Sequence, residues 1–139
     1  MGSIDIIIDK MIKMEQYIKE LGTLKPNSFS EYISDMRTQY AIERVIQLII
    51  DLALDINNII LSHMDRPPAS DYFNSFIDVA ECGVIDMDFA VGIAPSSGLR
   101  NRLVHEYEKI NDEIVYSSID QVIKMYTEYM VYIKGNFID

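Results

Sequence analysis

Apolar residues recur at steps of three and four along most of the chain, the spacing that places them on one face of an α-helix. The first run covers residues 4–18 and is followed by Gly22 and Pro26, residue types that commonly mark the end of a helix. No stretch of alternating apolar and polar residues, the pattern of a half-buried β-strand, competes with this period. The pattern therefore predicts an all-α protein.

The longest run predicts a central helix that forms the spine of the fold. Asn27 or Ser28 is a candidate N-cap, Glu31 lies at capping-box distance from Ser28, and neither glycine nor proline follows before Pro67. Proline lacks an amide donor and pushes the residue before it out of the α region, so the helix should end there. Because Asp51 and Asp55 interrupt its apolar positions, we do not expect this helix to span a membrane.

Shorter helical segments follow the central helix. Asp71 and Asp86 are candidate N-caps, and Ser96 or Ser97 is a candidate cap for a restart after Pro95. The predicted segments are 71–83, 86–95, 96–107 and 112–133. We interpret residues 4–139 as one domain, a bundle of about five helices with one long central helix, and residues 1–3 as a remnant of cloning.

Charge and composition narrow the function classes. The 139 residues carry 22 acidic and 12 basic side chains, a formal charge of −10, which argues against broad nucleic-acid binding through phosphate contacts. The stretch from Asp71 to Asp88 holds five acids and no base, which predicts a solvated face or, second, a docking face for a basic partner. One cysteine excludes an internal disulfide, and the N-terminus lacks the pattern of a signal peptide. We expect a cytoplasmic protein.

Known metal and cofactor motifs are absent from the sequence. The two histidines, His63 and His105, lie far apart, and no His-Glu-x-x-His pattern, glycine-rich phosphate loop or Gly-x-Ser-x-Gly elbow occurs. Asp51 and Asp55 are one helical turn apart, and we expect them to form a solvated helix edge or line an interface. We therefore predict no bound metal and no cofactor.

One stretch, residues 97–107, gathers polar side chains that suit chemistry on a phosphodiester. Arg100, Asn101, Arg102, His105 and Tyr107 lie close together in an otherwise acidic half of the chain. An imidazole, with an ordinary pKa of about 6.5, can accept a proton from a 2′-hydroxyl or donate one to a leaving oxygen. A guanidinium can bind a phosphate through two hydrogen bonds. Metal-free RNA cleavage requires this combination.

The helical geometry of this stretch does not by itself assemble a site. At 100° per residue, Arg100 and His105 lie about 140° apart around a helix, whereas Asn101 and His105 share a face. The long reach of arginine, an irregular first turn after Ser97 or a second subunit could close the site. A histidine with satisfied hydrogen bonds and two solvating arginines would have no catalytic role, and composition alone favours that interpretation.

The motif resembles a known family. Arg100, His105 and Tyr107 stand in the R-x-x-x-x-H-x-Y pattern of HEPN-domain proteins, and Asn101 follows the arginine directly. The run 40–44 (Tyr-Ala-Ile-Glu-Arg) within the long helix also fits. Over about residues 5–133 the chain is similar to the HepT-like toxins, which implies an HEPN-like helical fold.

The resemblance implies a function, partners and site residues. A toxin of this kind is a metal-independent endoribonuclease in a type VII-like toxin–antitoxin system, acting as a homodimer that pairs two motif copies across a cleft. Arg100 and His105 would be catalytic, with Asn101 and Arg102 in support. The antitoxin would be an MntA-like nucleotidyltransferase that transfers AMP to Tyr107, placing negative charge where RNA phosphate must bind. RNA is the implied substrate, and neither DNA nor a membrane is expected.

Two other functions stay open. The chain could be a non-catalytic helical module that serves as a docking partner or modification substrate of a nucleotidyltransferase. It could also be a helical bundle without any site. The presence of a small nucleotidyltransferase in the neighbouring reading frame would favour the family interpretation over the last of these.

Overall fold

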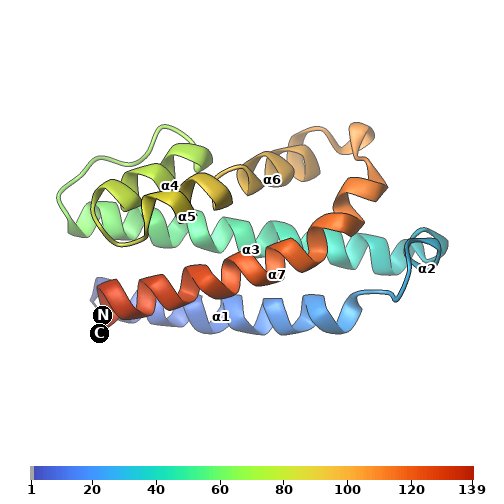
Figure 1. The fold of residues 1–139 in the computed structure, drawn as a ribbon, viewed down its shortest axis with the longest axis horizontal. Helices are drawn as coiled ribbons and strands as arrows, with labels where there is room; N and C mark the ends of the chain where they lie inside the picture. Colours follow the sequence, from blue (N-terminus) through green and yellow to red (C-terminus); the bar gives the residue numbers. More distant parts are fainter. Residues whose placement is uncertain (1) are drawn as a thin grey trace.

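One long helix, α3 (Met36–His63), runs through the middle of the molecule and contacts most of the other helices (Figure 1). The computed structural model describes residues 2–139, except for the side chain of residue 107. The described residues contain no β-strand, so the predicted all-α class is confirmed. The other helices are α1 (Ser3–Leu24), α2 (Phe29–Ser34), α4 (Tyr72–Glu81), α5 (Met87–Ile93), α6 (Ser96–His105), α7 (Asp112–Ile133), the 3₁₀ turn η1 (Tyr107–Lys109) and the π-helical turn η2 (Lys134–Ile138).

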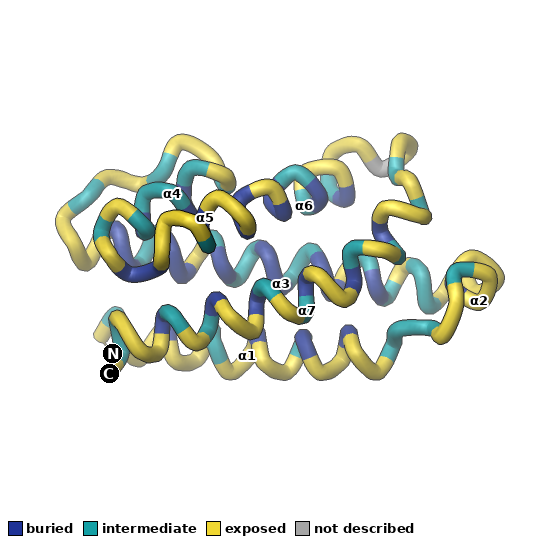
Figure 2. Tube along the Cα trace, in the orientation of Figure 1, coloured by how far each residue is buried: buried dark blue, intermediate teal, exposed yellow. Residues whose placement is uncertain are grey.

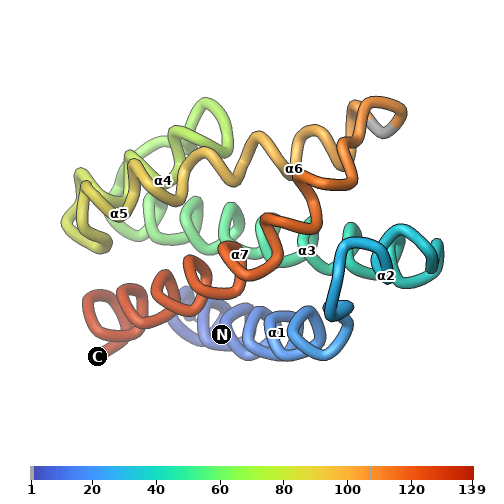
Figure 3. The backbone as a smooth tube through the Cα atoms, turned by 45° about the vertical axis from the view of Figure 1, so that its right-hand side comes forward, coloured from blue at the N-terminus to red at the C-terminus, as the bar shows by residue number. Residues whose placement is uncertain are grey.

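The helices lie on two sides of α3. Helices α4, α5 and α6 lie on one side, and α1 and α7 lie together on the other, in both views of the backbone (Figures 1 and 3). Helix α2 packs at the end where α3 begins, and both chain termini lie at the opposite end (Figure 1). This arrangement places α6, which carries most of the predicted site, directly against α3.

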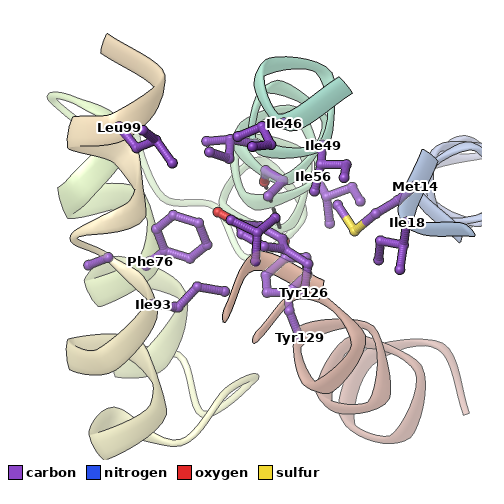
Figure 4. Close-up of a cluster of buried hydrophobic side chains, with 14 of the residues drawn as sticks. Met14, Ile18, Ile46, Ile49, Ile56, Phe76, Ile93, Leu99, Tyr126 and Tyr129 are labelled. Atoms are coloured by element: carbon purple, nitrogen blue, oxygen red, sulfur yellow. Dashed lines mark hydrogen bonds between the residues drawn. The ribbon is translucent and has the colours of Figure 1, made fainter. Parts of the chain in front are cut away.

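The core fills the space between these layers. From Ile42 to Leu61 one face of α3 is buried, whereas α1 alternates between buried and exposed positions (Figure 2). Side chains from both sides of α3 meet in one cluster around Phe76, Tyr126 and Tyr129 (Figure 4). Truncating one large core side chain to alanine in such a cluster typically costs about 2–5 kcal/mol of folding free energy.

Two sets of hydrogen bonds join helices inside this core. The Tyr126 hydroxyl on α7 lies 2.7 Å from Ser96 Oγ at the start of α6. In the second set, Asn57 of α3 donates to Ser75 Oγ of α4 at 2.9 Å and accepts a bond from the Tyr129 hydroxyl of α7. Burial raises the pKa of both tyrosines, so both hydroxyls stay protonated. These bonds hold α4, α6 and α7 in register with α3.

Helix α3 is long and apolar enough to cross a membrane by length and composition alone. Half of its apolar window is buried inside the bundle, as in the core helix of a folded domain. The two aspartates that interrupt its apolar positions each form an ion pair, Asp51 with Arg100 and Asp55 with Lys10.

The predicted second helix is divided in two at Asp35. This residue has extended backbone angles (φ −126°, ψ 96°), and its carboxylate accepts hydrogen bonds from the amides of Arg37 and Thr38. It therefore caps α3, while α2 forms a separate helix of six residues. Ile33 and Met36 continue the apolar period across the break, yet they are 51% and 62% exposed, so no packing holds one continuous helix there.

The predicted caps have mixed outcomes. Ser28 and Asp71 cap α2 and α4 as expected. Asp86 makes no side-chain cap bond, and Ser96 and Ser97 bond backward to the carbonyls of residues 93 and 94 instead of capping α6. The described part of the chain contains seven α-helices, because the break at Asp35 adds α2 to the predicted helical segments, while α5 and α6 are separate as predicted. Residue 1 lies outside the described residues, and Ser3 already begins α1.

Candidate functional site

Helix α6 is oriented by its two buried leucines. Leu99 and Leu103 are one turn apart and point into the core, and Ser96 is held at the N-terminal end by Tyr126. This fixes the helix rotation, so that Arg100, next to Leu99, faces α3 and α4.

Arg100 is anchored by two residues that are distant in sequence. Its Nε donates to Oδ1 of Asp51 on α3 at 2.7 Å, and the side chains of Arg100 and Asp51 are only 14% and 28% exposed. The guanidinium carbon lies 4.5 Å from the ring centroid of Tyr72 on α4, in the position of a cation–π contact. The Tyr72 hydroxyl also donates to Asp51 Oδ1 at 3.1 Å. Arg100 is therefore held by an ion pair with Asp51 and by contact with the ring of Tyr72.

The phenol of Tyr72 stays protonated in this cluster. Burial, followed by the charge of Asp51, raises the pKa of Tyr72, so its hydroxyl remains a donor. Gln47 adds a third, longer donor to Asp51, at 3.5 Å. Among the described side chains, Arg100 donates hydrogen bonds through Nε alone. Both terminal nitrogens are thus left to bind an anion such as a phosphate.

His105 and Asn101 lie on a different part of α6. His105 is the last residue of the helix, and both side chains are exposed to solvent. Within the described part of the chain, neither takes part in a side-chain hydrogen bond or an ion pair. Asn101 and His105, which the helical period places on one face, are therefore not hydrogen-bonded to each other in this structure. Tyr107 begins the turn η1, and its side chain lies outside the described residues.

Arg102 faces toward α7, away from Arg100. With Lys109 it lines a hollow of about 100 Å³ between α6, the following turn and the start of α7. The cations of the motif therefore lie on two sides of α6. The single chain brings Arg100 together with Asp51 and Tyr72, but not with His105, Asn101 or Arg102.

A groove follows α3 beside the motif, and we call it the α3–α6 groove. It has a volume of about 240 Å³ and is lined by Tyr40, Glu43, Arg44 and Gln47 of α3 and Leu103 of α6. Burial, and then the nearby charge of Asp112, raise the pKa of the Glu43 carboxyl.

Metal ligands do not gather anywhere in the described residues. No three His, Cys, Asp or Glu side chains of this part of the chain lie close enough to hold an ion together. The polar groups around Arg100 are instead hydrogen-bond donors and one carboxylate that is already paired.

The comparison with protein families gives a clear match. The profile described as "Ribonuclease HepT-like" matches residues 14–133, most of the chain. The chain belongs to the ribonuclease HepT-like family. The predicted resemblance is therefore confirmed over the region that contains the motif.

The relatives of this HepT-like chain agree with that assignment. It is 34% identical over 134 residues to the tRNA nuclease HepT of Aphanizomenon flos-aquae, covering 96% of this chain and 91% of the relative. Its fold matches a toxin–antitoxin crystal structure with AMP-PNP (TM-score 0.86, 23% identity, 94% and 98% of the two chains). It also matches the tri-AMPylated HEPN toxin of Shewanella oneidensis in complex with its MNT antitoxin (TM-score 0.85, 24% identity, 97% and 99%). The two structural matches establish the HEPN fold.

Two residues beside Arg100 in this HepT-like chain were not predicted as part of the site. Asp51 was expected to be a solvated helix edge or to line an interface, and it instead forms the ion pair with Arg100. Tyr72 falls within the predicted helical segment 71–83, where no role was expected for it. The one available signal was an aspartate among the apolar positions of the central helix, where a charge needs a partner.

Proposed function

We propose that this HepT-like protein is a metal-independent endoribonuclease toxin, with Arg100 and His105 as its catalytic groups. The observation that carries the proposal is the setting of Arg100. A paired carboxylate and an aromatic ring hold its guanidinium, its terminal nitrogens are free of hydrogen bonds to described side chains, and an exposed histidine ends the same helix. The tRNA nuclease activity named for the Aphanizomenon relative supports the same chemistry.

The residues suit cleavage through the 2′-hydroxyl of RNA. One imidazole accepts the 2′-hydroxyl proton, the 2′-oxygen bonds to phosphorus, and the bond from phosphorus to the 5′-oxygen breaks. A protonated imidazole donates a proton to that leaving oxygen, which gives a cyclic phosphate and a 5′-hydroxyl. Arg100 stabilises the negative charge that builds on the phosphoryl oxygens. No step of this reaction requires a metal ion.

The separation of Arg100 and His105 supports a dimeric site. Arg100 is turned toward α3, whereas His105 is exposed at the end of α6. In a homodimer that pairs two motifs across a cleft, two arginines and two histidines would face one phosphate. One histidine would then act as the base and the other as the acid. Asn101 and Arg102 would contact the flanking RNA.

The proposed partner is an MntA-like nucleotidyltransferase, and the proposed setting is the cytoplasm. The structural neighbours are a toxin with AMP-PNP and an AMPylated toxin, each in complex with an antitoxin. We assign the modification of this chain to Tyr107, two residues after His105. An added AMP there would bring negative charge and bulk to the cleft and repel the RNA backbone.

An RNA cleavage assay with EDTA present tests this proposal. Purified protein should cleave RNA, and the variants Arg100→Ala and His105→Ala should each leave it intact while keeping the helical circular-dichroism spectrum. Lys13→Ala, which removes an exposed charge from α1, is the matched control and should cleave as the wild type does. Cleavage that survives in both site variants would refute the proposal. RNA left intact by the wild type, together with binding to the nucleotidyltransferase, would support the non-catalytic module instead.

A further inference from the structure

The α3–α6 groove continues directly from the site of Arg100. Gln47 lines the groove and also donates to Asp51, the partner of Arg100. Leu103, which forms the α6 side of the groove, lies between Arg100 and His105 in the motif. A strand of RNA with its phosphate at Arg100 would therefore pass along this groove.

The groove offers two groups that suit a nucleotide. Tyr40 is 50% exposed, so much of its ring is available for stacking against a base. Arg44 lies one helical turn further along the same face of α3 and is exposed. Within the described residues it forms no ion pair, which leaves its guanidinium available for a phosphate.

Glu43 supplies a third group, which suits hydrogen-bond donors rather than a phosphate. Its carboxylate is half-buried in the groove and accepts no hydrogen bond among the described residues. A partly desolvated carboxylate gains from two neighbouring donors. Guanine alone among the four RNA bases presents two adjacent donors, its N1–H and its 2-amino group, on the Watson–Crick edge.

We propose that the α3–α6 groove binds one guanine nucleotide of a single-stranded RNA, with the base stacked on Tyr40, its donor edge at Glu43 and a phosphate at Arg44. The inference rests on the proposed ribonuclease function and adds a substrate class to it. The RNA is single-stranded because pairing in a duplex occupies the Watson–Crick edge and stacking covers the face of the base.

Steady-state cleavage of a short, guanine-containing single-stranded RNA tests the two contact residues. Tyr40→Ala and Arg44→Ala should each raise KM about tenfold and leave kcat nearly unchanged, because they bind the substrate away from the reacting phosphate. Tyr40→Phe keeps the ring and should restore the KM of the wild type. Lys13→Ala removes one positive charge from the far side of the bundle and should leave KM unchanged. Unaltered KM in both alanine variants would overturn the proposal.

The base preference tests Glu43. Four RNAs that differ only in having G, A, C or U at one position are compared with the wild type and with Glu43→Gln. The wild type should prefer the guanine substrate, and the variant should lose most of that preference, because an amide replaces one acceptor with a donor. An identical preference in both proteins would contradict the assignment.

Two further measurements separate this inference from the proposed function. If the wild type cleaves no RNA, the proposed function fails. Fluorescence anisotropy then measures the affinity for the same four RNAs and tests the groove alone. Tyr40→Ala should bind the guanine RNA about tenfold more weakly than the wild type, whether or not the RNA is cleaved. Sedimentation tests whether a second copy fills the groove. Tyr40→Ala and Arg44→Ala should keep the oligomeric state of the wild type, and their conversion to monomers would overturn the proposal.

Discussion

Arg100 on α6 donates from Nε to Oδ1 of Asp51 on α3 at 2.7 Å, across 49 residues of sequence. Tyr72 contributes both a ring beside the guanidinium and a second hydrogen bond to the same carboxylate oxygen. Because Arg100 is fixed through Nε, its terminal nitrogens keep one orientation without any help from the substrate. With Arg100 as the proposed catalytic group, this pre-organisation would give Asp51 a positioning role in catalysis.

Replacing Asp51 should therefore slow the reaction. Asp51→Ala is expected to lower kcat on the order of 100-fold, since a small misplacement of a catalytic group costs about that much, and to change KM little. Asp51→Asn keeps an oxygen that can accept from Nε and should retain more activity. Asp55→Ala is the matched control, because Asp55 lies on the same helix, is exposed and pairs with Lys10. Equal kinetics for Asp51→Ala and Asp55→Ala would contradict the positioning role.

The buried amide of Asn57 should matter for stability. Asn57→Ala removes the bond donated to Ser75 Oγ and the bond accepted from the Tyr129 hydroxyl, and each hydroxyl keeps only its bond to a backbone carbonyl. The loss of two buried hydrogen bonds should lower the free energy of unfolding by about 1–3 kcal/mol. Urea unfolding followed by circular dichroism measures the loss. The exposed Asn27 provides the control, and Asn27→Ala should change stability by less than about 0.5 kcal/mol. Equal stability of the two variants would show that the network contributes nothing.

Glu43 should give the stability a pH dependence. Burial and Asp112 raise the pKa of its carboxyl in the folded state above the ordinary value of 4.5. The folded state therefore binds the proton more tightly than the unfolded state, and Glu43 lowers stability as pH rises above about 4.5. Glu43→Gln should be more stable than the wild type at pH 7, and the difference should vanish below about pH 4. Urea unfolding at several pH values tests this, and a variant less stable at pH 7 would contradict it.

Modification at Tyr107 is tested by mass. Mixed with the proposed nucleotidyltransferase partner and ATP, the protein should gain mass in multiples of AMP and lose its ribonuclease activity. Tyr107→Phe should gain no mass and remain active in the presence of the partner. Mass spectrometry of the intact chain follows both. An increase in mass that persists in Tyr107→Phe would assign the modification to another residue.

The period of apolar residues predicts much of this fold, because burial on one face of a helix determines that period. It predicts α1 and α7 closely, and α3 from Met36 onward. It fails at Asp35, where Ile33 and Met36 keep the period but remain exposed. The period reflects only where apolar residues stand in the sequence, whereas a helix is stabilised by the contacts that those residues make in the folded chain.

The site was only partly predictable for a similar reason. The motif and its spacing mark Arg100 and His105, and the helical period already indicates that they face different directions. Nothing local indicates that Asp51 and Tyr72 meet Arg100, because that contact depends on how α6 packs against α3 and α4. Residue pairs of this kind become visible only in the folded chain.

The most direct test of the account is whether two copies of the chain build one active site. A doubly inactive copy, Arg100→Ala with His105→Ala, is mixed in increasing excess with the wild type, and RNA cleavage per wild-type chain is measured in EDTA. Affinity tags on the two copies verify that mixed dimers form. The account predicts that cleavage per wild-type chain falls as mixed dimers replace wild-type dimers. Unchanged cleavage per wild-type chain, with mixed dimers present, would contradict it.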